Sequence, residues 1–128
     1  MTAFCKQSVL WTSGNEDYHT YRIPALIVTP AGTVLAFCEG RRNSSSDTGD
    51  IDMLVKRSTD GGRSWSNHEM VWADGENTCG NPCAVVDRET GDIWLLMTHN
   101  LGTDREVQII DQTSEGARTV WVVVSKDD

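Results

Sequence analysis

An internal repeat constrains the fold of this chain more than any other feature. Pro24 begins an apolar run, a turn containing Pro and Gly, and a second apolar run, and a similar order recurs from Pro82, 58 residues later. Short apolar runs bounded by turn residues predict β-hairpins. Repeats of about 40 to 50 residues or longer, each with four antiparallel strands, are typical of propeller blades. The sequence therefore predicts an all-β, propeller-type fold with about two blades, and no helical periodicity competes with it.

The first repeat reads as four strands and the second as three. The ranges predicted as strands are 23–28, 33–38, 51–57, 66–72, 83–86, 92–97 and 118–124, with a strand-like piece at 7–11. The polar stretches 39–50 and 98–117 are predicted to be loops. We assign residues 1–20 to a lead-in segment, about 21–72 to the first blade and 73–128 to an incomplete second blade.

The octet STDGGRSW, residues 58–65, connects the third and fourth predicted strands. Asp60 before paired glycines is a hairpin signal, because Gly62 and its neighbour take positive φ without steric cost. The side chains of Ser58 and Asp60 can bond to turn amides, and Trp65 can pack beneath the turn. This pattern favours a structural turn over a catalytic site.

A partial copy of the octet appears at the end of the chain. Ser125 and Asp127 match Ser58 and Asp60, and the sequence ends before the expected Gly and Trp. Because a propeller needs at least about four blades to close, we expect this chain to be part of a longer protein.

Composition excludes several classes of partner. The net charge is -8 and the pI is about 4.7, which argues against nucleic acid or an anionic membrane as a general partner. No window approaches the roughly eighteen apolar residues of a membrane span, and the N-terminus lacks a signal-peptide pattern. Cys79 and Cys83 have no nearby His to complete a zinc site, and Cys38 reads as a buried small hydrophobe. We predict no metal and no cofactor, while the oligomeric state is left open.

The strand order predicts which polar residues meet. Connections in an antiparallel meander alternate between two ends, so Arg22, Arg41, Arg42, Asp47 and Asn81 are expected at the end opposite the octet. Arginines beside an Asp form an anion site with a proton donor, since guanidinium groups bind carboxylates bidentately. The alternative is that the paired arginines are solvated loop charges and that Asp47 is a turn residue.

Four motifs carry a resemblance to a known family. YRIP (21–24), LAFCEGRR (35–42), KRSTDGGRSW (56–65) and GNPCAVVDRETGDIWLL (80–96), with Asp47 between the second and third, resemble the N-terminal part of an exo-α-sialidase with Asp-box (BNR) repeats. The octet alone is a weak signal, whereas RIP followed at this interval by GRR, an Asp and the octet is strong. The resemblance spans about residues 18–128.

The resemblance implies a six-bladed propeller, a glycoside hydrolase that removes terminal sialic acid from glycoconjugates. It implies that Arg22 and Arg41 are two of three arginines that bind the substrate carboxylate. Asp47 matches the general acid and base, which must begin protonated and is therefore expected to be partly buried. Asn81 stands where many relatives carry an Asp at the N-acetyl pocket. A secreted or extracytoplasmic location is also implied.

The nucleophile implied by the resemblance is a Tyr, as in sialidases generally, which gives retention of configuration. That Tyr, its Glu partner and the third Arg belong to later blades, so this chain alone is expected to be inactive. Tyr18 and Tyr21 do not match their positions. Asp104 and Glu106 are either pocket residues or solvated loop charges, and Asp50 and Asp52 compete with Asp47 for its role. The alternative function is a non-catalytic Asp-box propeller that binds glycans or proteins.

Overall fold

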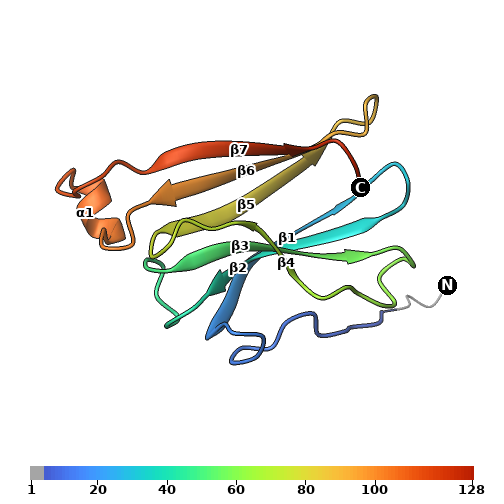
Figure 1. The fold of residues 1–128 in the computed structure, drawn as a ribbon, viewed down its shortest axis with the longest axis horizontal. Helices are drawn as coiled ribbons and strands as arrows, with labels where there is room; N and C mark the ends of the chain where they lie inside the picture. The colour runs from blue at the N-terminus through green and yellow to red at the C-terminus, as the bar shows by residue number, and fades with distance from the viewer. Residues whose placement is uncertain (1–4) are drawn as a thin grey trace.

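The computed structural model describes residues 5–128, which form antiparallel strands and one short helix (Figure 1). The elements are β1 (Thr20–Val28), β2 (Val34–Arg41), β3 (Ile51–Ser58), β4 (Glu69–Trp72), β5 (Thr78–Val86), β6 (Ile93–Asn100), α1 (Glu106–Ile110) and β7 (Thr119–Ser125). The predicted all-β class is confirmed, and each of the seven predicted strands after the lead-in has its counterpart.

The strands form two antiparallel groups that correspond to the two repeats. In the first group β1 pairs with β2, β2 with β3 and β3 with β4, and in the second β5 pairs with β6 and β6 with β7. The two groups meet where β3 and β5 pair in parallel, at Ile51 and Thr78. Each group is thus a meander of the kind that forms a propeller blade.

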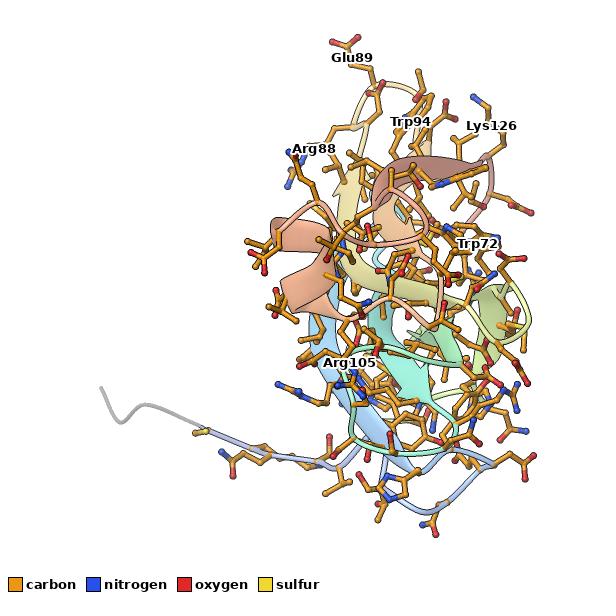
Figure 2. All side chains as sticks on the ribbon, turned by 90° about the vertical axis from the view of Figure 1, so that its left-hand side faces the viewer. Trp72, Arg88, Glu89, Trp94, Arg105 and Lys126 are labelled. Carbon is orange, nitrogen blue, oxygen red and sulfur yellow. The ribbon has the colours of Figure 1, made fainter. Side chains whose placement is uncertain are left out.

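Apolar side chains from the two groups share one core. Leu35, Phe37 and Met53 of the first group pack with Ile93, Leu95 and Met97 of the second. Along β6, buried and exposed residues alternate, as expected when one face of a strand lies on a core. The opposite face of the second group is also apolar, and Trp94 lies on it with 39% of its surface exposed (Figure 2).

The connections lie at two ends of the molecule, as the strand order predicts. Figure 1 shows the loops after β2, β4 and β6, with α1, at one end, which we call the rim, and the turns after β1, β3 and β5 at the other. Figure 2 looks onto the rim, where Arg105 precedes α1.

The octet forms the hydrogen-bonded turn that its sequence predicts. Ser58 donates to Asp60 Oδ1 at 2.9 Å, and the same oxygen accepts the amides of Arg63 and Ser64. Hydrogen bonds from the Ser64 hydroxyl, then from its amide and from Ser58, hold the pKa of Asp60 well below its usual range. Trp65 donates its indole N–H to the carbonyl of Gly62. The turn is a structural device far from the rim.

The incomplete octet begins in the same way. Ser125 donates to Asp127 Oδ1 at 2.9 Å, the distance found between Ser58 and Asp60. The local hydrogen bond therefore needs only the Ser-x-Asp part of the pattern.

Three predictions about secondary structure are wrong. Residues 7–11 form no strand, because the segment is held by side-chain contacts, among them the bond from Lys56 Nζ to the Leu10 carbonyl. The stretch 98–117 is not wholly a loop, since β6 continues to Asn100 and α1 follows. β2 continues to Arg41, because Glu39, Gly40 and Arg41 pair with both β1 and β3.

Candidate active site

A polar pocket of about 160 Å³ opens at the rim between the two groups of strands. It is lined by Ile23, Glu39, Arg41, Asp47, Thr78, Asn81, Glu106 and Arg118. A second cavity of about 170 Å³ lies between the two groups beside the apolar core and has mainly aliphatic walls. That second cavity includes Arg57 and Asp127, whereas the rim pocket gathers more ionisable groups, namely Glu39, Arg41, Asp47, Glu106 and Arg118, and is the better candidate for chemistry.

Arg22 is the exposed arginine of the site. It lies on β1, and its Nη1 is 3.0 Å from Asp47 Oδ1. Its side chain remains 47% exposed, so its other donors face solvent. A guanidinium group in this state can bind an incoming carboxylate without first losing buried partners.

Arg41 is enclosed, in contrast with Arg22. Its side chain is 3% exposed and lies at the end of β2. Its Nε and Nη2 donate to Glu39 Oε2, and its Nη1 donates to the Ser45 carbonyl at 2.7 Å. Its Nη2 also lies 2.8 Å from Asp47 Oδ1. The second positive charge of the site is thus fixed from beneath.

Asp47 meets both arginines through one oxygen, Oδ1. The loop that carries it is attached at its end, where Thr78 Oγ1 accepts the amide of Gly49 and donates to its carbonyl. The expected partial burial of Asp47 is not found, because its side chain is 64% exposed and the loop lies at the open rim. The carboxylate is held by charge, not by enclosure.

Two matching bulges aim side chains into the pocket. The register shifts between Arg22 and Ala25 in β1 and between Gly80 and Cys83 in β5. Within them Ile23 and Asn81 take φ of 55° and 56°, a left-handed conformation that is rare for a β-branched residue such as Ile. Bulges commonly re-aim side chains next to active sites, and both residues line the pocket.

Asn81 lies at the rim, at the end opposite the octet, as the strand order predicts. Its Nδ2 donates to Thr98 Oγ1 at 2.8 Å, which fixes the plane of the amide. Its side-chain oxygen remains an acceptor in a residue that lines the pocket.

Arg42 does not line the pocket, contrary to the prediction. Its guanidinium group lies over the ring of Tyr18, 4.7 Å from the centroid, and its Nη2 is 2.8 Å from Asp52 Oδ2. The reason is strand alternation, which directs neighbouring residues to opposite faces. Asp52 is 1% exposed and bonded to Tyr18, so it does not compete with Asp47. Burial raises the pKa of Asp50, and Asp50 also lies outside the pocket wall.

The second rim loop contributes one of its two acidic candidates. Glu106, the first residue of α1, lines the pocket. Asp104 is 1% exposed and accepts the amides of Glu115 and Gly116, so it holds the loop together instead.

Sequence reasoning missed Glu39 and Arg118. Arg118 precedes β7, lines the pocket and donates from Nε to Asn100 Oδ1 at 3.2 Å. Its position before a strand that starts at the rim was the available signal. Glu39 falls in the stretch 39–50 that the sequence predicts as a loop, which hides its role in the strand.

Two further properties bear on the class of protein. Within residues 5–128, no group of three or more His, Cys, Asp or Glu side chains is arranged to hold a metal ion. The same part of the chain contains no helix long and apolar enough to cross a membrane.

The meander units, the Ser-x-Asp turns and the arginine-rich rim pocket define an Asp-box protein with propeller-type blades. The chain belongs to the BNR repeat-like domain family, whose description matches residues 18–127. This match confirms the Asp-box (BNR) assignment made from the four motifs.

The most similar proteins include named sialidases. An exo-alpha-sialidase of Arthroderma benhamiae is 35% identical over 126 residues, covering 87% of this chain and 31% of that protein. A sialidase of Micromonospora viridifaciens is 43% identical over 90 residues, covering 66% of this chain and 14% of its own length. The solved structure of the Hadza microbial sialidase Hz136 superposes with a TM-score of 0.78 at 28% identity, covering 91% of this chain and 25% of that one. The chain thus spans a third or less of these relatives, and the resemblance to exo-α-sialidases is confirmed for that part.

Proposed function

We propose that the protein carrying this chain is an exo-α-sialidase, a glycoside hydrolase that removes terminal sialic acid from sialylated glycans with retention of configuration. The observation that carries the proposal is the contact of both Arg22 and Arg41 with Asp47 at the mouth of one polar pocket, which Arg41 and Asp47 line. The similarity to named sialidases supports the substrate class.

The substrate carboxylate would bind at the arginines. Arg22 offers exposed donors, and Arg41 supplies a second positive charge from the pocket wall. Sialic acid carries its carboxylate on the anomeric carbon, so this pairing fixes the reacting carbon while positive charge develops on the ring. Asn81 accepts a hydrogen bond from the substrate at the other side of the pocket.

Asp47 would act as the general acid and then as the general base. Its exposed carboxyl group can reach a leaving oxygen at the open rim. When the substrate carboxylate takes the donors of Arg22, Asp47 loses one of its two ion pairs and is free to contact the leaving oxygen. After the aglycone leaves, the same carboxylate accepts a proton from the attacking water.

Neither tyrosine near the site is a suitable nucleophile. Tyr18 is 3% exposed and donates to Asp52, and Tyr21 donates to the carbonyl of Asn15. Neither lines the pocket. We therefore assign the nucleophilic Tyr to a residue outside this chain. The resemblance to sialidases places its Glu partner and the third Arg outside it as well, and we expect residues 1–128 alone to be inactive.

The experiment measures hydrolysis of a methylumbelliferyl α-sialoside by the full-length protein. Asp47→Ala is expected to lower kcat/KM by about 10²- to 10⁴-fold, the usual contribution of a general acid or base. Asp111→Ala, at an exposed carboxylate after α1, is the control and should retain activity. Absence of turnover by the native protein would refute the hydrolase and favour a glycan-binding propeller. If NMR shows that the first sialic acid released has the inverted anomeric configuration, retention is refuted.

A further inference from the structure

Glu39 is a buried carboxylate in the wall of the pocket. Its side chain is 4% exposed, and its strand partners are Arg22 in β1 and Met53 in β3. An ionised group so far from water needs charged or hydrogen-bonding partners. All of the partners found for Glu39 belong to the site.

One oxygen of Glu39 orients Arg41. Oε2 accepts from Arg41 Nε at 3.0 Å and from Nη2 at 2.7 Å. Two bonds from one guanidinium edge fix both its position and its plane. The same Nη2 faces Asp47 Oδ1 at 2.8 Å, so the direction in which Arg41 meets Asp47 depends on Glu39.

The other oxygen connects Glu39 to the second repeat. Oε1 accepts the backbone N–H of Asn81 at 2.9 Å, within the bulge of β5. A Cβ atom on Gly80 would lie 2.4 Å from this oxygen. The absence of a side chain at Gly80 is therefore what gives Glu39 its place.

Four charged side chains meet at the site and their charges sum to zero. Arg22 and Arg41 face Glu39 and Asp47, which gives two positive and two negative charges in contact. Without the charge of Glu39, the enclosed Arg41 keeps Asp47 as its remaining carboxylate partner. Asp47 would then be drawn toward the pocket wall and away from the open rim.

We propose that Glu39 is a positioning residue of the reaction: it neutralises and orients Arg41, so that Asp47 keeps the place from which it transfers a proton to the leaving oxygen. The inference rests on the proposed sialidase function.

The first test is Glu39→Gln in the full-length protein. A glutamine has one oxygen and one NH₂ group, so either Arg41 or the Asn81 amide must face a donor. Because Glu39 acts through the acid, the loss should depend on the aglycone. We expect kcat/KM to fall about 100-fold for sialyllactose, whose leaving group needs a proton, and about 10-fold or less for a nitrophenyl sialoside, whose leaving group does not. Glu89→Gln is the matched control: it lies in the exposed turn after β5, which Figure 1 shows at the end opposite α1, and Figure 2 shows Glu89 at the outer edge of the molecule.

Gly80→Ala is the second test and leaves every charged residue in place. Its methyl group should displace Glu39 Oε1 and produce the same dependence on the aglycone. If Glu39→Gln does not fold, Gly80→Ala still tests the positioning role of Glu39. An equal loss for both sialosides, in either folded variant, would overturn the positioning role, because lower stability reduces all substrates alike.

A crystal structure of Glu39→Gln separates this inference from the proposed function. If the native protein hydrolyses neither sialoside, the proposed function fails. Displacement of Arg41 from Asp47 in the variant would still support the orienting contact. An unmoved Arg41 would overturn it whatever the activity.

Discussion

The buried pair of Tyr18 and Asp52 allows a stability prediction with a magnitude. The Tyr18 hydroxyl donates to Asp52 Oδ2 at 2.7 Å, and the two residues are 3% and 1% exposed. Tyr18→Phe removes the donor and keeps the ring that packs on Cys38 and Leu54. A hydrogen bond to a charged group contributes about 1.5–3 kcal/mol. Arg42 still neutralises Asp52 at 2.8 Å, so the cost should stay below the roughly 3–5 kcal/mol of an unpaired buried charge. We expect a loss of about 2 kcal/mol.

Urea unfolding at pH 7, followed by tryptophan fluorescence, measures this loss. Tyr21→Phe is the matched control, because the Tyr21 hydroxyl donates at the same distance, 2.7 Å, to the neutral carbonyl of Asn15. It should cost about 0.5–1.5 kcal/mol. The reasoning fails if Tyr18→Phe costs no more than Tyr21→Phe at an unchanged m-value.

Three shorter predictions concern the core, the octet and the thiols. Met53→Ala, at a residue with 0% exposure in the shared core, should lower the unfolding free energy by about 2–5 kcal/mol, whereas Met70→Ala, at 51% exposure, should change it by less than about 1 kcal/mol in the same urea titration. Hydrogen bonds from the Ser64 hydroxyl and neighbouring groups lower the pKa of Asp60 in the folded state. The ionised carboxylate therefore stabilises the fold above its unfolded pKa of about 4, and this contribution is lost as the pH falls. The difference in Tm between the native protein and Asp60→Ala should be largest above about pH 5 and should shrink toward pH 2. Burial raises the pKa of Cys38 to about 12, so Cys38 should react with a thiol reagent at pH 8 only after the protein unfolds. The exposed Cys5 and Cys83 should react at once. Modification of a third thiol in the folded protein would contradict this prediction.

Hairpin connectivity made the location of the site predictable. Once the apolar runs are assigned as consecutive antiparallel strands, each loop must lie at one of two ends. This places Arg22, Asp47 and Asn81 together although 25 and 34 residues separate them along the chain. The structure brings all three to the rim, and the inference needed no side-chain detail.

The directions of individual side chains were not predictable in the same way. Arg41 and Arg42 are adjacent and look equivalent, yet β2 runs through Arg41 and sends the two side chains to opposite faces. The charged residues Glu39 and Arg41 look like loop residues in the sequence. They can be buried in a strand because Glu39 has a hydrogen-bond partner far away in the sequence, which local patterns do not reveal. That partner is the Asn81 amide, 42 residues from Glu39.

The site arises from a difference between two otherwise equivalent bulges. Arg22, Ile23 and Pro24 in β1 correspond to Gly80, Asn81 and Pro82 in β5, and the middle residues share nearly the same φ. In the first repeat the position before the bulge carries a guanidinium group for an anion. In the second it carries no side chain, and Glu39 fills the space. Any residue larger than glycine at position 80 would displace Glu39 and leave Asp47 as the remaining carboxylate partner of the buried Arg41. The asymmetry between Arg22 and Gly80 therefore lets the first repeat supply both Arg22 and Glu39, while the second repeat leaves room for Glu39 and holds it through the Asn81 amide.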